Sequence, residues 1–136
     1  MQKEVETYEM NEELQKVFDA LQGWGHKKVK ETKKVAIFSS TKTQKNFCLI
    51  LEIDGVRRDR LIGVERYAVV FDPRLPVEQL NDLPGVVTKS KEYNNSNMSC
   101  FPKHKNTGET EVRFGKKLLI EGLGNFGEIL EKYDEL

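Results

Sequence analysis

Residues 94–115 read NNSNMSCFPKHKNTGETEVRFG, a long polar segment between two more apolar parts of the chain. The segment is too polar to form core, since lysine, asparagine and glutamate side chains are rarely buried. Two aromatic pairs stand within it, Phe101-Pro102 and Phe114-Gly115. We expect these pairs to attach the segment to the body of the protein, with residues 103–111 presented as a loop between them.

The end of this segment has the alternation of a half-buried strand. Val112 and Phe114 alternate with Glu111 and Arg113, which is the period of two that a strand with one buried face requires. Gly115 then predicts a bend before the next apolar residues. The sequence therefore places a strand, and then a change of direction, directly after the polar segment.

Helical periodicity occurs at both ends of the chain. In residues 10–21 the apolar side chains recur at the spacing of one helical face, and Asn11 is suited to cap that helix. A second helix is predicted from residue 125, with one apolar face made by Phe126, Ile129, Leu130 and Tyr133. Apolar runs between the helices predict strands at residues 35–38, 47–53 and 67–71, and residues 86–88 are expected to start a further strand. The pattern favours an α+β fold, in which an antiparallel sheet of four or more strands is flanked by the N-terminal and C-terminal helices.

Length and composition indicate one folded unit with a well-solvated surface. The chain has 136 residues, of which 38% are hydrophobic and 32% are charged. We expect residues 1–9 to form an acidic, frayed leader and residues 10–136 to form a single globular domain. No apolar run approaches the ~20 residues that a membrane-spanning helix needs, and the first residues are acidic rather than signal-like. We therefore expect a cytoplasmic protein with no membrane partner.

The net charge of zero conceals a separation of charge along the chain. Residues 1–14 contain one lysine and five glutamates, and residues 121–136 contain one lysine and five acidic residues, so each end carries −4. The part between them, residues 15–120, therefore carries +8. A basic body between acidic ends is compatible with an anionic partner for one face of the protein.

Cysteine and histidine are too few to indicate a disulfide framework or a metal site. We expect Cys48 and Cys100 to be reduced, with Cys48 a small buried hydrophobe. Cys100 and His104 form the one pair at ligand-like spacing, and no second pair completes a tetrahedral site, so we expect no metal and no cofactor. Nucleophilic catalysis by this pair would require the loop to bring thiol and imidazole together.

Two further enzyme classes lack part of their pattern. A carboxylate nuclease needs a Glu-x-Lys on the strand beside its aspartate, and neither Asp54 nor Asp72 has one, although both follow predicted strands. The glycines of GLGNFG, residues 122–127, resemble a dinucleotide fingerprint, but no second strand can follow within the remaining residues. Packing at the start of a helix accounts for them better, and the sequence favours a protein that is not an enzyme.

The basic residues of the polar segment favour binding to a polyanion. Lysines supply charge for phosphate groups, amides supply hydrogen bonds, and an aromatic ring supplies stacking. We therefore predict an intracellular protein that contacts nucleic acid or another polyanion through a basic sheet-and-loop face. The predicted binding residues are Arg57, Arg58, Arg60, Asn97, Phe101, Lys103, His104, Lys105, Arg113 and Lys116.

Two alternatives remain open at this stage. The first is a module that binds a protein partner, for example a regulator or inhibitor from a mobile element, with Phe101 or Trp24 as its anchor. The second is a small hydrolase or nuclease, for which the sequence offers neither a triad nor a complete metal set.

Several short motifs, taken in order, resemble the YgaC-type domain of unknown function. They are the break Leu-x-x-Trp-Gly after the first helix, the run 67–73, the pairs Phe101-Pro102 and Phe114-Gly115, and the closing helix. The resemblance covers most of residues 10–134 and departs from the family at Asp72, where a histidine would stand. It implies a small α+β fold and brings no catalytic residues with it.

Overall fold

The computed structural model describes residues 12–53, 56–57, 66–105 and 111–136, and the acidic leader lies outside them. An antiparallel sheet of seven strands has the order β1-β2-β3-β6-β9-β7, and β8 pairs with β9 beyond the end of β6. An N-terminal and a C-terminal helix flank the sheet. The predicted α+β class and its antiparallel sheet are therefore confirmed.

The elements have the following bounds. The helices are α2 (Glu12–Gly23), the short 3-10 helix η2 (Val77–Leu80) and α3 (Leu123–Asp134). The strands are β1 (His26–Glu31), β2 (Val35–Ser40), β3 (Asn46–Ile50), β4 (Glu52–Ile53), β5 (Val56–Arg57), β6 (Arg66–Phe71), β7 (Val86–Asn94), β8 (Lys103–Lys105) and β9 (Glu111–Glu121).

Strands β3 and β6 form the centre of the sheet, with a neighbouring strand on each side. Their sequences are almost continuously apolar because both faces of the sheet are covered at this point. Phe47 and Leu49 belong to the core beneath α2 and α3, on what we call the helix face, whereas Cys48 and Ile50 belong to a second core on the opposite face. The run 67–71 predicted as a strand is confirmed. The run 47–53 is divided, because β3 ends at Ile50 and β4 pairs with β5 in a separate two-stranded sheet.

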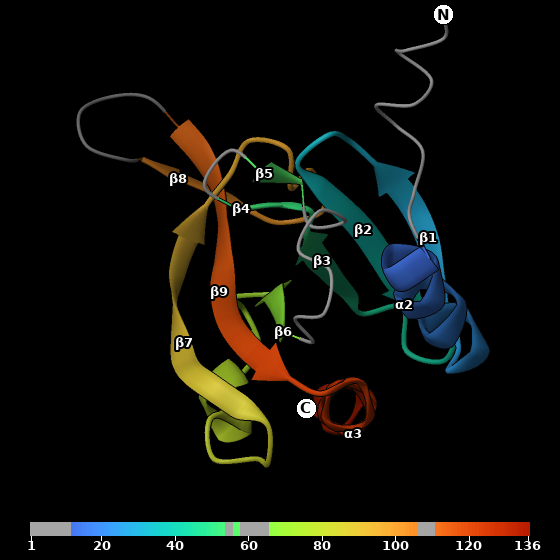
Figure 1. Ribbon diagram of the computed structural model, residues 1–136. Helices are drawn as coiled ribbons and strands as arrows, with labels where there is room; N and C mark the ends of the chain where they lie inside the picture. The colour runs from blue at the N-terminus through green and yellow to red at the C-terminus, as the bar shows by residue number, and fades with distance from the viewer. Residues whose placement is uncertain (1–11, 54–55, 58–65, 106–110) are drawn as a thin grey trace, which may run out of the picture.

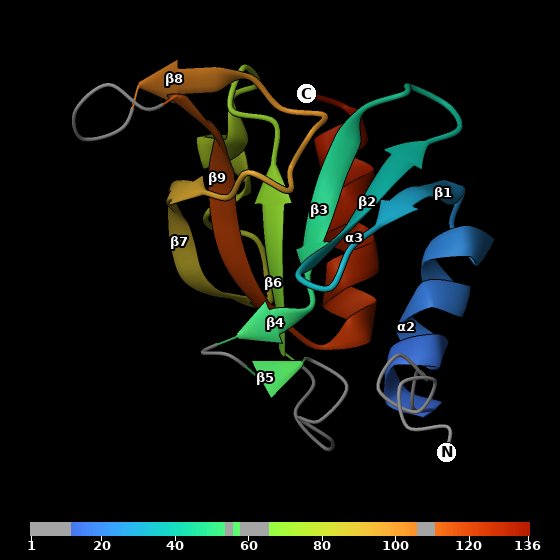
Figure 2. The ribbon, with the colours of Figure 1, turned by 90° about the horizontal axis from the view of Figure 1, so that it is seen from above.

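Both helices bury their apolar stripes on the helix face. Burial of each such side chain contributes roughly 1.5–3 kcal/mol, so these stripes are the main force holding the helices to the sheet. Figure 2 shows α3 behind the central strands and α2 beside β1. The buried helical residues are Leu14, Val17, Phe18 and Leu21 of α2, and Phe126, Ile129, Leu130 and Tyr133 of α3.

A strap formed by residues 95–102 covers the opposite face of the sheet, which we call the strap face. Figure 2 shows the chain between β7 and β8 crossing β9 and β6 on the side away from α3. Met98 and Phe101 of the strap are 0% and 1% exposed, and they pack in the second core with Val70. The prediction that Phe101 attaches the polar segment to the body of the protein is therefore confirmed.

Strand β9 corrects two predictions about the polar segment. It runs without interruption from Glu111 to Glu121, between β6 and β7, so Gly115 marks no bend (Figure 1). Residues 103–105 are not loop either, since they form β8 and pair with the first residues of β9. Strand β7 likewise extends to Asn94, further than residues 86–88 predicted. Residues 106–110 of the predicted loop lie outside the described residues.

Trp24 joins the end of α2 to α3 rather than to the sheet. A β-carbon added to Gly127 would lie 2.9 Å from an atom of the indole ring, so the ring rests directly on this glycine. The ring also meets Phe126 edge-on, with 6.4 Å between centroids. The glycines of residues 122–127 thus lie at the start of α3, as predicted, and Gly122 precedes the helix with a φ of 91°.

Strand β1 is an exposed edge strand rich in lysine. Its residues after His26 are exposed, and its pairing with β2 shifts register between Lys28 and Lys30. Lysines and a bulge both discourage another strand from pairing with an open edge. Among the described residues, no helix combines the length and the apolar character that crossing a membrane requires.

Candidate nucleic-acid interface

Four basic residues lie together on the strap face, where β7, β9 and β8 run side by side. Lys103 of β8 is paired in register with Arg113 of β9, and Lys91 of β7 is paired with Lys117 of β9. Residues 113, 115 and 117 share one face because successive side chains of a strand point to opposite faces. That face carries the strap, since Gly115 packs beneath Phe101. We call Lys91, Lys103, Arg113 and Lys117 the basic stripe.

The basic stripe has a defined spacing. Directly opposite residues on antiparallel strands have β-carbons about 5 Å apart, which sets the distance within each pair. The two pairs are four residues apart along β9, or about 13 Å at the usual rise of a strand. The stripe therefore presents two pairs of cations on a rigid sheet at a fixed separation.

Local contacts hold the two cations of β9. The guanidinium of Arg113 donates a hydrogen bond to the backbone carbonyl of Phe101 at 2.6 Å, which uses one of its five N–H donors. The ammonium of Lys117 lies 4.9 Å from the centroid of the Tyr93 ring, a cation–π contact. Lys91 and Lys103 are exposed, and neither they nor Arg113 make an ion pair with a carboxylate among the described residues.

Carboxylates on the strap face of β9 stand only at its two ends. By the alternation of the strand, these are Glu111, which is paired in register with Lys105, and Glu121. Glu121 is held by Arg66 at 3.7 Å. Between these two ends, the charged side chains of β9 on the strap face are the basic Arg113 and Lys117.

His104 and Lys116 lie on the helix face, away from the basic stripe. The His104 imidazole stacks on Phe114 with 4.1 Å between centroids, and its Nε2 lies 3.1 Å from both Asn94 Oδ1 and Glu92 Oε2. Lys116 pairs with Glu78 of η2 and thereby lowers the pKa of that carboxyl. These two predicted binding residues therefore contact neighbours on the helix face, opposite the basic stripe.

Two other predicted binding residues are structural. The Phe101 ring is 1% exposed, so it offers no surface for stacking on a base. Asn97 is half-buried and donates from its side-chain amide to Asn95 Oδ1 at 3.0 Å, a contact within the strap. Both residues therefore make contacts that hold the strap in place.

The remaining predicted residues are only partly accounted for. Arg57 belongs to β5 and is paired in register with Glu52, and Lys105 belongs to β8. Arg58 and Arg60 lie outside the described residues. Of the ten predicted binding residues, Lys103 and Arg113 are the two that the structure brings together as a described pair of cations.

The sequence analysis missed Lys91 and left Lys117 out of the predicted binding residues, and these two lysines complete the basic stripe. The signal for Lys117 was the alternation that begins at Glu111, which continues through Gly115 once the glycine is not taken as a bend. Lys91 carried no comparable signal, because β7 is an edge strand with two register irregularities and no regular alternation.

Cys100 and His104 do not form a nucleophile and base. Cys100 packs with the second core on the strap face, where its sulfur lies 3.9 Å from that of Cys48. His104 lies on the opposite face of the sheet against Phe114. The sheet therefore separates the two groups that this hypothesis needed to meet.

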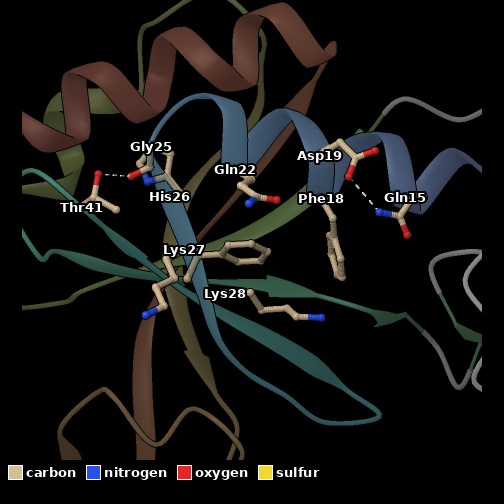
Figure 3. Close-up of a pocket in the computed structure, with 10 residues that line it drawn as sticks. Gln15, Phe18, Asp19, Gln22, Gly25, His26, Lys27, Lys28 and Thr41 are labelled. Carbon is tan, nitrogen blue, oxygen red and sulfur yellow. Dashed lines mark hydrogen bonds between the residues drawn. The ribbon is translucent and has the colours of Figure 1, made fainter.

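A groove of about 530 Å³ lies between α2 and β1 (Figure 3). Phe18 and Asp19 face it from the helix, and Lys27 and Lys28 face it from the strand. Gln15 donates to Asp19 at 2.8 Å, and the Lys28 ammonium lies 4.8 Å from the centroid of Phe18. Gln15, Asp19 and Lys28 thus already have partners within the groove.

A second groove, of about 740 Å³, brings a serine, a histidine and an aspartate together at the end of α3. The Ser40 hydroxyl donates to Asp134 at 3.0 Å and accepts from the backbone N–H groups of Lys42 and Thr43. His26 Nδ1 is buried without a hydrogen-bond partner in the described structure, so it is not the base of Ser40. These contacts fasten the turn after β2 to α3 rather than activate a nucleophile.

Among the described residues, no group of three or more histidine, cysteine, aspartate or glutamate side chains is placed to hold a metal ion. The candidate site is the basic stripe, in which four cations share one face of the sheet. No protein-family model, curated protein or solved structure matches this chain, so the resemblance to YgaC-type domains stays an expectation based on its motifs.

Proposed function

We propose that the protein binds nucleic acid through phosphate contacts made by the basic stripe. The observation that carries the proposal is the register of three strands, which sets Lys103 beside Arg113 and Lys91 beside Lys117 on one face. Phosphate groups dominate the affinity of such surfaces, because each contact by a cation releases condensed counterions.

The spacing of the basic stripe suits a regular polyanion. Its two pairs are about 13 Å apart, which is close to the rise of four base pairs, at about 3.4 Å each, along the axis of a duplex. A sheet also keeps that spacing without an ordering cost on binding, in contrast to cations on a free loop.

The chemistry of the basic stripe favours binding without sequence preference. Base readout needs side chains in a groove or an open aromatic platform for stacking. Tyr93, which lies beside the stripe, has the Lys117 ammonium over its ring, and Phe101 is buried. Contacts are therefore expected with phosphate oxygens, which carry no sequence information directly.

Fluorescence polarisation with labelled duplex and single-stranded oligonucleotides tests this function. We expect binding at low salt that weakens steeply as salt is added, similar affinity for unrelated sequences, and competition by heparin. Absence of binding to every oligonucleotide at low salt would contradict the proposal. Binding to a protein partner that survives high salt, with no oligonucleotide binding, would favour the protein-binding alternative instead.

A pair of matched variants assigns the binding to the stripe. Lys91→Gln/Lys103→Gln removes two exposed cations from the strap face. Lys42→Gln/Lys132→Gln removes two exposed cations from the side of the protein that carries α3. Both variants lose the same charge, so a non-specific effect of net charge would weaken binding equally in both.

A further inference from the structure

The two cysteines of the chain lie side by side although 52 positions separate them. Cys48 is in the middle of β3, and Cys100 is in the strap that crosses the sheet. Their sulfur atoms are 3.9 Å apart, within the range of a weak S–H hydrogen bond. Both cysteines were predicted to be reduced, and both are free thiols in the structure, where they form a close pair.

The two thiols differ in exposure. Cys48 is 0% exposed beneath the strap, whereas Cys100 is partly exposed at the surface of the strap. A reagent in solution can therefore reach Cys100 before it reaches Cys48. Cys48 is shielded from solvent, but its sulfur lies next to that of Cys100. This asymmetry is the arrangement of an attacking thiol and a resolving thiol.

The contacts of the two thiols favour ionisation at Cys100 rather than at Cys48. The hydrogen bond from Cys48 lowers the pKa of the Cys100 thiol, with a smaller contribution from the Arg113 guanidinium, while burial and the Asp72 carboxylate act in the opposite direction. The hydrogen bond to Cys100, together with burial, raises the pKa of Cys48. Cys100 is thus the sulfur that ionises, and the thiolate is the reactive form of cysteine.

We propose that Cys100 is a modification site for hydrogen peroxide and that Cys48 resolves the product to an intramolecular disulfide. Peroxide is the oxidant that fits, because the Cys100 sulfur is only partly exposed and the reagent must be small. The disulfide would join the strap covalently to the centre of the sheet.

The chemistry balances in two steps. The Cys100 thiolate attacks one oxygen of hydrogen peroxide, an S–O bond forms, the O–O bond breaks, and hydroxide leaves as a sulfenic acid is formed. The Cys48 sulfur then attacks the oxidised sulfur, an S–S bond forms, the S–O bond breaks, and the departing hydroxide takes the proton of Cys48 as water. Overall, two thiols and one peroxide give one disulfide and two waters.

The pair can close with a small movement. A disulfide has an S–S length of about 2.05 Å, so the sulfurs must approach each other by about 2 Å. Cys100 lies outside the strands of the sheet. The strap is hydrogen-bonded to β9 at its two ends, through Asn95 and Pro102, and between them it makes turns such as Phe101 N–H to the Met98 carbonyl. The Cys100 side chain can therefore turn toward Cys48 without breaking a strand pairing.

Intact-mass spectrometry and peptide mapping of the full chain after treatment with hydrogen peroxide test the proposal. We expect the wild-type protein to lose two hydrogens, to yield one peptide pair that joins Cys48 and Cys100, and to recover its mass with dithiothreitol. The thermal unfolding midpoint of the oxidised protein should rise by several degrees, because the new bond constrains a long loop of the unfolded chain.

Single variants assign the roles of the two thiols. In Cys48→Ser, Cys100 should form a sulfenic acid that cannot go on to a disulfide. Dimedone should trap this sulfenic acid, and without dimedone Cys100 should gain further oxygen. In Cys100→Ser, Cys48 should stay reduced under the same treatment. Circular dichroism checks that each variant is folded. If a variant does not fold, the peptide map of the oxidised wild-type protein still tests the proposal.

Three results would overturn the proposal. They are a wild-type protein that gains oxygen at Cys100 without losing the free thiol of Cys48, disulfides formed only between molecules, and oxidation of Cys48 in Cys100→Ser as fast as that of Cys100 in Cys48→Ser. Treatment with glutathione disulfide gives a separate comparison, since equally fast closure by this larger oxidant would contradict the argument from restricted access.

Discussion

The ring of Phe101 lies directly against Gly115, so that a β-carbon at Gly115 would come 3.0 Å from Cδ2 of Phe101. The same β-carbon would lie 2.5 Å from Val70 Cγ1 and 2.8 Å from the Phe71 carbonyl oxygen. Gly115 is thus needed for space rather than for a turn. Its missing side chain lets the strap descend onto the sheet beside the basic stripe.

Gly115→Ala should destabilise the protein by about 1–3 kcal/mol or more, because a methyl group must displace backbone as well as side chains. Urea unfolding followed by circular dichroism measures the change. Gly124→Ala is the matched control, since no atom lies within 4 Å of a β-carbon there and alanine favours the helix by up to ~1 kcal/mol. Equal stability of Gly115→Ala and the wild type would show that the strap does not pack as described.

Phe101→Ala should cost about 3–5 kcal/mol of stability, because it leaves a cavity between the strap and the strands beneath it. Phe101→Leu should cost less, since it keeps most of the apolar volume. Both variants should retain nucleic-acid affinity under conditions where they remain folded, because the ring is buried. Loss of affinity in folded Phe101→Leu, with stability nearly unchanged, would instead make the ring a contact residue.

Tyr133 joins α3 to two strand ends through one hydroxyl group. Its oxygen accepts from the backbone N–H of Asp72 at 3.1 Å and donates to the carbonyl of Asn46 at 2.5 Å. Tyr133→Phe leaves both backbone groups without this partner and should cost about 1–3 kcal/mol at pH 7. Chemical unfolding of the variant and the wild type at pH 7 measures this difference.

The Tyr133 hydroxyl should also make stability depend on alkaline pH. Burial raises the pKa of Tyr133, so its neutral form contributes stability that is complete below pH 10.0, its ordinary pKa, and is lost as pH rises above that value. The wild type should therefore lose more stability above pH 10 than Tyr133→Phe does. Parallel losses in the two proteins would rule out this contribution.

His26 should make stability depend on mildly acid pH. Burial lowers the pKa of His26 despite the opposing effect of Asp134, so the folded state favours the neutral ring. Its contribution is complete above pH 6.5 and is lost as pH falls from there towards the lowered pKa, by at most about 1.4 kcal/mol per pH unit. Unfolding free energies from pH 7.5 to pH 5 measure this slope.

The other histidine of the chain supplies the control for that slope. His26→Gln should flatten the loss of stability between pH 6.5 and pH 5, whereas His104→Gln should retain it. His26 also faces Asp134 across the second groove, so Asp134→Asn tests how this carboxylate affects the loss of stability in acid. Removing the opposing charge should make the acid loss steeper, and an unchanged slope in His26→Gln would assign the effect to other groups.

Sequence patterns predicted the parts of the fold in which the periodicity of apolar residues matches the burial of their side chains. The apolar stripe of α3 and the runs in β3 and β6 are buried as their periodicity indicates. Strand β7 carried a weaker signal, since its outer residues alternate irregularly at an exposed edge. Its full extent is set by pairing with β9, which only the tertiary structure reveals.

The candidate site was harder to predict because it depends on register. Lys103 and Arg113 were predicted from their shared segment, but Lys91 joins them through the pairing of β7 with β9. Likewise, Cys48 and Cys100 are close because the strap crosses β3, and no spacing along the chain indicates that crossing. Gly115 was misinterpreted because the sequence alone does not distinguish a glycine needed for close packing from a glycine needed for a turn.

The salt dependence of duplex binding by the two double variants tests the central claim most directly. The slope of log K against log salt should be about −3 to −4 for the wild type if the four cations each meet a phosphate. Lys91→Gln/Lys103→Gln should reduce the magnitude of that slope by about 2, and Lys42→Gln/Lys132→Gln should leave it unchanged. Equal slopes in the two variants, or binding that does not depend on salt, would contradict the assignment of the basic stripe as a nucleic-acid interface.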